Sequence, residues 1–126
     1  IQGFQTVPLI GPSSILLALM ASGFNGQSFT FKGYLDRDSG KKTKVIREME
    51  SLANHYFKTQ IFMETPYRNE SMWEDLMKTL QGETKLCVAA NISLPNEYIR
   101  TKTVSEWKKG NKQNLSKIPA IFLLGS

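Results

Sequence analysis

The sequence predicts an α/β protein, a three-layer sandwich in which helices cover a mixed β-sheet. Short segments with the apolar or alternating pattern of strands are separated by segments whose apolar residues recur at helical spacing. Two strand patterns, at residues 85–91 and 97–103, are joined by a turn at Pro95-Asn96 rather than by a helix. Such a short connection favours an antiparallel pair, so we expect a sheet that is not purely parallel.

Proline and glycine mark the first strand and the first helix. Residues 5–9 predict a short strand that Pro8 confines to a sheet edge or a strand end. Pro12 suits the first position of a helix, because its missing N–H would have no partner there, and Gly23 is expected to end that helix after Ser22. The apolar residues lie on nearly all sides of this helix and predict that it is buried; they are Ile15, Leu16, Leu17, Leu19 and Met20.

Strand and helix patterns alternate along the rest of the chain. Two helices are predicted from apolar residues at helical spacing, one over residues 41–54 and one around Trp73 and Leu76 that Gly82 is expected to stop. The remaining elements are strands at 29–35, 59–64, 85–91, 97–103 and 120–125, a polar loop at 36–40 and a short helix at 104–109 closed by Gly110. Because residues 120–125 are continuously apolar, we expect the central strand there.

Size and composition indicate one globular domain over residues 1–126. With 40% hydrophobic and 21% charged residues, the chain lacks the composition of a disordered protein. The first residue is Ile1 rather than methionine, so we expect a piece of a longer protein. The longest apolar run, residues 15–21, is far shorter than the roughly 20 residues of a membrane span, and we expect no membrane partner.

Charge and cysteine content indicate the setting. The single cysteine, Cys87, cannot form an internal disulfide, which favours a reducing, cytoplasmic environment. Lys and Arg number 16 against 11 Asp and Glu, a formal charge of +5. This balance favours a polyanionic partner, although a solvated basic surface explains it equally well. The cations expected to meet phosphates in the first case are Arg37, Lys41, Lys42, Lys44 and Arg47.

The sequence carries none of the common catalytic constellations. His55 ends an amphipathic helix, where a solvated or capping role is more common than catalysis. Glu74 and Asp75 are adjacent on a helix, so their carboxylates diverge and cannot act as a pair. No metal-ligand spacing and no phosphate-binding motif occurs. The catalytic residue stays unassigned, no metal site is predicted, and an enzymatic role must depend on binding and positioning.

The start of the first helix, Gly11-Pro-Ser-Ser14, suggests two roles. A helix N-terminus leaves N–H groups unpaired and carries a partial positive charge, so it can hold the polar edge of a ligand. Alternatively, Ser13 or Ser14 only caps the helix, which is the more common role.

Four motifs in order resemble the C-terminal half of the tetrapyrrole methylase family. They lie at residues 7–23, 31–35, 62–68 and 117–125, and the closest branch is that of ribosomal RNA small subunit methyltransferase I, which 2′-O-methylates a ribose of 16S rRNA. The resemblance implies a two-domain methyltransferase that binds S-adenosylmethionine between its halves. It further implies ribosomal RNA as substrate, an N-terminal domain that is absent here, a homodimer, and no activity of the isolated half.

The resemblance also implies which residues contact the cofactor. They lie at the ends of predicted strands or at the start of the first helix, where exposed backbone groups can bind an adenine edge. The implied cofactor-binding residues are Ser13, Ser14, Met63, Glu64, Ala90, Asn91, Pro119 and Ala120. For Tyr67 and Arg68 we expect a structural role rather than substrate contact.

One stretch departs from the ribosomal branch. Asn91, Ser93 and Leu94 stand where that branch carries Glu, Thr and Lys. Two alternatives to RNA methylation therefore stay open. One is methylation of a tetrapyrrole or another small heterocycle, and the other is a non-catalytic paralogue that dimerises or senses a ligand.

Overall fold

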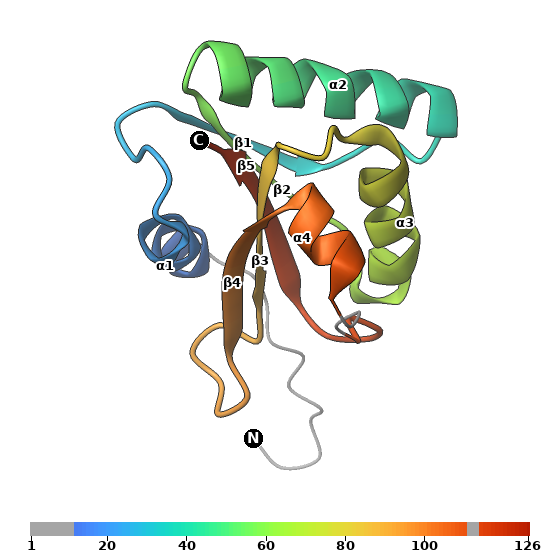
Figure 1. Cartoon of the computed structure of the whole chain (residues 1–126). Coiled ribbons are helices and arrows are strands. Elements are labelled where there is room, and N and C mark those ends of the chain that lie inside the picture. The colour runs from blue at the N-terminus through green and yellow to red at the C-terminus, as the bar shows by residue number, and fades with distance from the viewer. Residues whose placement is uncertain (1–11, 111–113) are drawn as a thin grey trace.

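The computed structural model describes residues 12–110 and 114–126, in which one mixed sheet has the strand order β1-β2-β5-β3-β4 (Figure 1). β1 and β2 are parallel, and the other neighbouring pairs are antiparallel. β5 lies in the centre and every one of its residues is buried, which confirms the prediction from its apolar sequence. The strands are β1 (Phe29–Tyr34), β2 (Thr59–Met63), β3 (Lys85–Ala90), β4 (Tyr98–Thr103) and β5 (Ala120–Gly125).

Helices cover both faces of the sheet, so the three-layer prediction is confirmed (Figure 1). The smaller core cluster lies under α1 and the larger one under the other three helices. The helices are α1 (Pro12–Ser22), α2 (Ser39–His55), α3 (Asn69–Thr79) and α4 (Val104–Lys109), with a 3-10 turn, η1 (Pro66–Arg68), before α3. None of the helices in the described part is long and apolar enough to cross a bilayer. The strand expected at residues 5–9 lies outside the described residues.

Local sequence sets most of the helix ends. α1 begins at Pro12, and Gly23 follows its end with a φ of 79°, as expected. α2 is capped by Asp38, whose carboxylate accepts the N–H of Lys41. α3 ends at Thr79 rather than at Gly82, because Leu80 is extended and turns into the core.

The prediction that α1 is buried is wrong. Leu16, Leu17 and Met20 are 51%, 43% and 78% exposed. α1 rests on the sheet along one side only, where Ala18 and Leu19 are buried. A sequence that is apolar all round cannot show how many sides of a helix are covered.

Replacing Gly125 by alanine is expected to destabilise the fold. A Cβ at this position would lie 2.6 Å from Cδ2 and 2.7 Å from Cδ1 of the Phe24 ring. Overpacking of this kind costs about 1–3 kcal/mol, which urea unfolding would measure. The control is Gly26→Ala, whose Cβ would meet only Leu19 Cδ2 at 4.0 Å. Equal stability of the two variants would contradict this account of the packing.

Candidate functional site

Three strands meet at one edge of the sheet. β5 runs antiparallel to both β2 and β3, so its start lies between their ends: Met63 pairs with Ile121, and Ala90 pairs with Ala120. Six of the eight residues predicted for cofactor binding therefore come together. We call them the candidate edge: Met63, Glu64, Ala90, Asn91, Pro119 and Ala120.

Backbone hydrogen bonds join the loops at the candidate edge. The N–H of Asn91 donates to the carbonyl of Pro119 at 3.0 Å, and the N–H of Lys117 donates to the carbonyl of Pro66 at 3.0 Å. Asn91 has a φ of 52°, a left-handed conformation that asparagine tolerates better than most residues. The chain therefore turns sharply away from the sheet directly after β3.

A buried amide holds the loop that leads into β5. Asn69 is fully buried at the start of α3, and its Nδ2 donates to the carbonyls of Leu115 at 3.0 Å and Ile118 at 2.7 Å. Asn69 is not among the residues predicted from the sequence. Its only local signal is a polar residue directly after the Pro66–Arg68 turn, and its partners lie more than 40 residues away.

The side chain of Glu64 closes a turn and does not point to a free site. Glu64 is 5% exposed; its Oε1 accepts the N–H of Thr65 at 2.8 Å, and its Oε2 lies 3.7 Å from Nε of Arg68. Arg68 therefore pairs with the carboxylate of its own turn, which is a structural contact. Tyr67, for which a structural role is also expected, is 81% exposed. What Glu64 offers at the candidate edge is its backbone.

An apolar groove connects the candidate edge with the start of α1. Its volume is about 470 Å³, which lies in the size range of small-molecule pockets. The groove is lined by Pro12, Ile15, Leu16, Phe29, Phe31 and Met63. Ser13 is exposed and Ser14 is half-buried in the same helical turn. Because α1 begins at Pro12, neither serine occupies the capping position before the helix.

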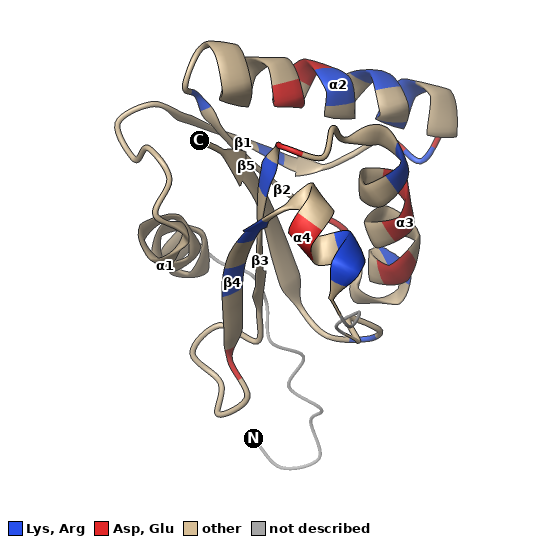
Figure 2. Cartoon of the chain, viewed as in Figure 1, with Lys and Arg blue, Asp and Glu red and all other residues tan. Residues whose placement is uncertain are grey.

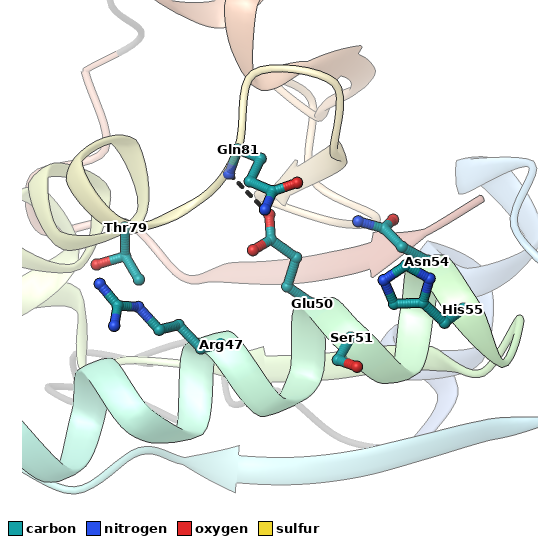
Figure 3. Close-up of a pocket in the computed structure, with 7 residues that line it drawn as sticks. All are labelled: Arg47, Glu50, Ser51, Asn54, His55, Thr79 and Gln81. Carbon is teal, nitrogen blue, oxygen red and sulfur yellow. Dashed lines mark hydrogen bonds between the residues drawn. The ribbon is translucent and has the colours of Figure 1, made fainter.

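A second pocket, of about 370 Å³, lies between α2 and the turn that follows α3 (Figure 3). Glu50 of α2 accepts hydrogen bonds there from the N–H of Gln81 at 2.7 Å and from the hydroxyl of Thr84. Asn54 donates to the Thr84 hydroxyl at 3.1 Å, while His55 is exposed at the helix end. These bonds attach α2 to the turn before β3, so we assign the pocket a structural role.

Cys87 lies in the middle of β3 and is fully buried. Burial raises the pKa of its thiol to about 11, and a hydrogen bond with Thr101 opposes that rise. A thiol in this state is not a nucleophile near neutral pH.

Comparison with known proteins places this fold among methyltransferases. No protein-family model matches the chain. It is 31% identical over 104 residues to ribosomal RNA small subunit methyltransferase I of Vibrio cholerae, covering 82% of the chain and 35% of that protein. The protein of the same name from Bacillus subtilis is 34% identical over 104 residues, covering 82% of the chain and 34% of that protein.

The chain is homologous to these methyltransferases. It spans about a third of their length. A solved structure of the methyltransferase CobJ is similar to this chain with a TM-score of 0.54 at 14% identity, covering 88% of this chain and 46% of that chain. This likeness confirms the methyltransferase-like fold that the motifs predict.

Replacing Asn69 by alanine is expected to lower the free energy of unfolding of this protein by about 2–4 kcal/mol, because a buried and a partly buried carbonyl lose their donor. Asn25→Ala is the control: its Nδ2 also donates to a carbonyl, that of Phe57, but at the exposed surface. That variant should lose about 1 kcal/mol or less. Similar losses in urea unfolding of both variants would refute the special role of Asn69.

The raised pKa of Cys87 predicts slow thiol chemistry and a specific pH dependence. At pH 8 the folded thiol should react about 100-fold more slowly with a disulfide reagent than the unfolded thiol, given the shift from 9.0 to about 11. The unfolded thiol ionises first, so stability due to the neutral buried thiol is present below pH 9 and is lost as the pH rises toward 11. The stability advantage of the wild type over Cys87→Ala should therefore shrink in that window.

Proposed function

We propose that this chain forms half of the cofactor cleft of an S-adenosylmethionine-dependent methyltransferase, and that a second domain of the complete protein forms the other half. The observation that carries the proposal is the convergence of Met63, Ala90 and Ala120 at the candidate edge. Homology to methyltransferases supports the same conclusion. The chain spans about a third of those relatives, so the second domain belongs to the proposal.

The residues of the candidate edge fit an adenosine group chemically. The groove beside Met63 is lined by apolar and aromatic side chains, which suit the face of a purine ring. Backbone groups beyond the ends of β2 and β3, together with the Asn91 side chain and the Ser13 and Ser14 hydroxyls, suit the polar edge and the ribose. The carboxylate of Glu64 is tied to Thr65 and Arg68, which leaves the groove without that charge.

The proposed contribution of this half to catalysis is orientation. S-adenosylmethionine, when bound, supplies an electrophilic methyl group on a sulfonium. The strand ends hold the adenosine end, and apolar walls exclude water, so the cofactor is held in one position relative to an acceptor. Oε1 of Glu64 accepts the N–H of Thr65, and Oε2 lies 3.7 Å from Nε of Arg68 without a hydrogen bond. We assign the base that accepts the acceptor's proton to the other domain or to the substrate.

The substrate that we propose is RNA, with ribose 2′-O-methylation of 16S rRNA as the expected reaction. The names of the homologues and the net charge of +5 support RNA. The departing residues Asn91, Ser93 and Leu94 lie in a tight turn that begins at the candidate edge with Asn91. In this turn, Ser93 N–H donates to Glu97 Oε1 at 2.8 Å, so the turn is ordered by its own residues.

A covering partner is part of the proposal. Leu16, Phe29 and Phe31 are exposed around one groove, and Leu17 and Met20 extend this apolar surface along α1. Contiguous apolar surfaces of this kind mark contact sites. The second domain and a second copy of the protein, the two partners that the motifs imply, are the proposed occupants.

The test uses the complete protein that contains this chain. S-adenosylmethionine should bind in calorimetry, and labelled methyl should pass to 16S rRNA. Ser13→Tyr places a ring at the exposed start of α1 and should weaken cofactor binding by about tenfold or more. Ser51→Tyr, the same change on the exposed side of α2, should leave binding unchanged.

The outcomes separate the alternatives. Cofactor binding with labelling of a small heterocycle instead of RNA would support the tetrapyrrole-type reaction. No cofactor binding by the complete wild-type protein would leave the non-catalytic module as the function.

A further inference from the structure

We propose that the substrate RNA backbone docks along a basic surface formed by β4 and α4, next to the candidate edge. This inference rests on the proposed function. The surface, called the β4 surface below, consists of Tyr98, Arg100, Lys102, Lys108 and Lys109. Figure 2 shows its lysines and arginine on two elements that follow each other in the chain.

The register of β4 aligns this surface with the candidate edge. Tyr98 pairs with Ala90, the last residue of β3, so β4 begins at that edge. Arg100 and Lys102 follow at two-residue steps and face the same side of the sheet as Tyr98. Each step measures about 6.8 Å along a strand, so the two cations form a line that leads away from the candidate edge.

Aromatic rings hold both cations in place. The guanidinium carbon of Arg100 lies 5.2 Å from the centre of the Tyr98 ring, and Nζ of Lys102 lies 4.7 Å from the centre of the Trp107 ring. Arg100 donates one of its five side-chain N–H groups to the carbonyl of Ile99, at 2.8 Å, so the guanidinium has further donors for a phosphate. Tyr98 is half-buried and supports the exposed Arg100. An exposed guanidinium held by a ring can bind a phosphate or stack on an unpaired base.

Nearby carboxylates are engaged by their own neighbours. Glu106 accepts hydrogen bonds from the Thr103 N–H at 2.9 Å and the Thr103 hydroxyl at 3.1 Å. The same bonds lower the pKa of Glu106, and the nearby cations Lys102 and Lys109 lower it further, so this carboxylate also offsets part of their charge. Glu97 accepts the N–H of Ser93. Lys108 and Lys109 add positive charge at the end of α4. Among the described residues, β4 is an outermost strand of the sheet.

The basic residues of α2 fit a docked RNA less well. Lys42 is buried and pairs with Asp75 at 3.1 Å, so it is not a free cation. Lys44 and Arg47 are exposed, but Glu48 is exposed on the same helix beside them. These two residues nevertheless provide a matched control, because they have the same charges as Lys102 and Arg100.

The experiment measures binding of purified 16S rRNA to the complete protein over a series of KCl concentrations. Arg100→Ala with Lys102→Ala should weaken binding about tenfold near 0.1 M salt and reduce the log–log salt slope by about 1.4, the value for two single-strand phosphate contacts. Arg47→Ala with Lys44→Ala removes the same charge and should change neither value appreciably. Arg100→Lys with Lys102→Arg keeps the charges and should retain the slope.

Cofactor affinity distinguishes this inference from the proposed function. Unchanged S-adenosylmethionine binding by the Arg100/Lys102 variant, with weakened RNA binding, would support the β4 surface. An unchanged salt slope of RNA binding in that variant would overturn the proposal. A larger loss of RNA binding in the Arg47/Lys44 variant than in the Arg100/Lys102 variant would also overturn it. Loss of cofactor binding by the wild type would instead count against the proposed function.

Discussion

The two hydrogen bonds donated by the Asn69 amide fix the geometry on which the candidate site depends. The loop before β5 carries the carbonyls of Leu115 and Ile118, and both point inward to one buried side chain. Since the loop ends at Pro119, the position of Pro119 determines where its carbonyl meets the N–H of Asn91. This interior donor therefore anchors the loop that leads into β5, while the ladder between β3 and β5 sets the register of the two strands.

The order of the strands explains why the residues of the candidate edge lie together. In a parallel sheet, the ends of several strands would form the site, but here the start of an antiparallel strand lies between two strand ends. Pro119 has a backbone carbonyl but no N–H. It can therefore only accept a backbone hydrogen bond, and it accepts the one that the N–H of Asn91 donates. Ala90 and Ala120 face each other as a cross-strand pair with little side-chain volume, and both are buried in the larger core cluster.

Most of the fold could be predicted because its signals are local. The apolar run at residues 120–125 indicated a central strand, and Pro12, Gly23 and Gly110 marked helix ends that the structure confirms. The burial of α1 could not be predicted, because the number of covered sides is a tertiary property. The same limit applies to Asn69, whose partners are distant in sequence, and to Glu64, whose side chain folds back on its own turn. The site residues were grouped by resemblance to a family, and the strand register supplies the physical reason why six of them are neighbours.

The central position of β5 has a consequence for how the chain is made. β1 and β2 can pair early, and β3 with β4 can form a hairpin, but these two units share no ladder until residues 120–125 enter between them. While the chain emerges from the ribosome, β2 and β3 both present unpaired edges, and such edges are where nascent chains associate wrongly. β5, the last strand that the structure describes, thus joins two separate units with unpaired strand edges into one sheet. A nascent chain that stalls before β5 would keep those edges unpaired and would be a substrate for chaperones.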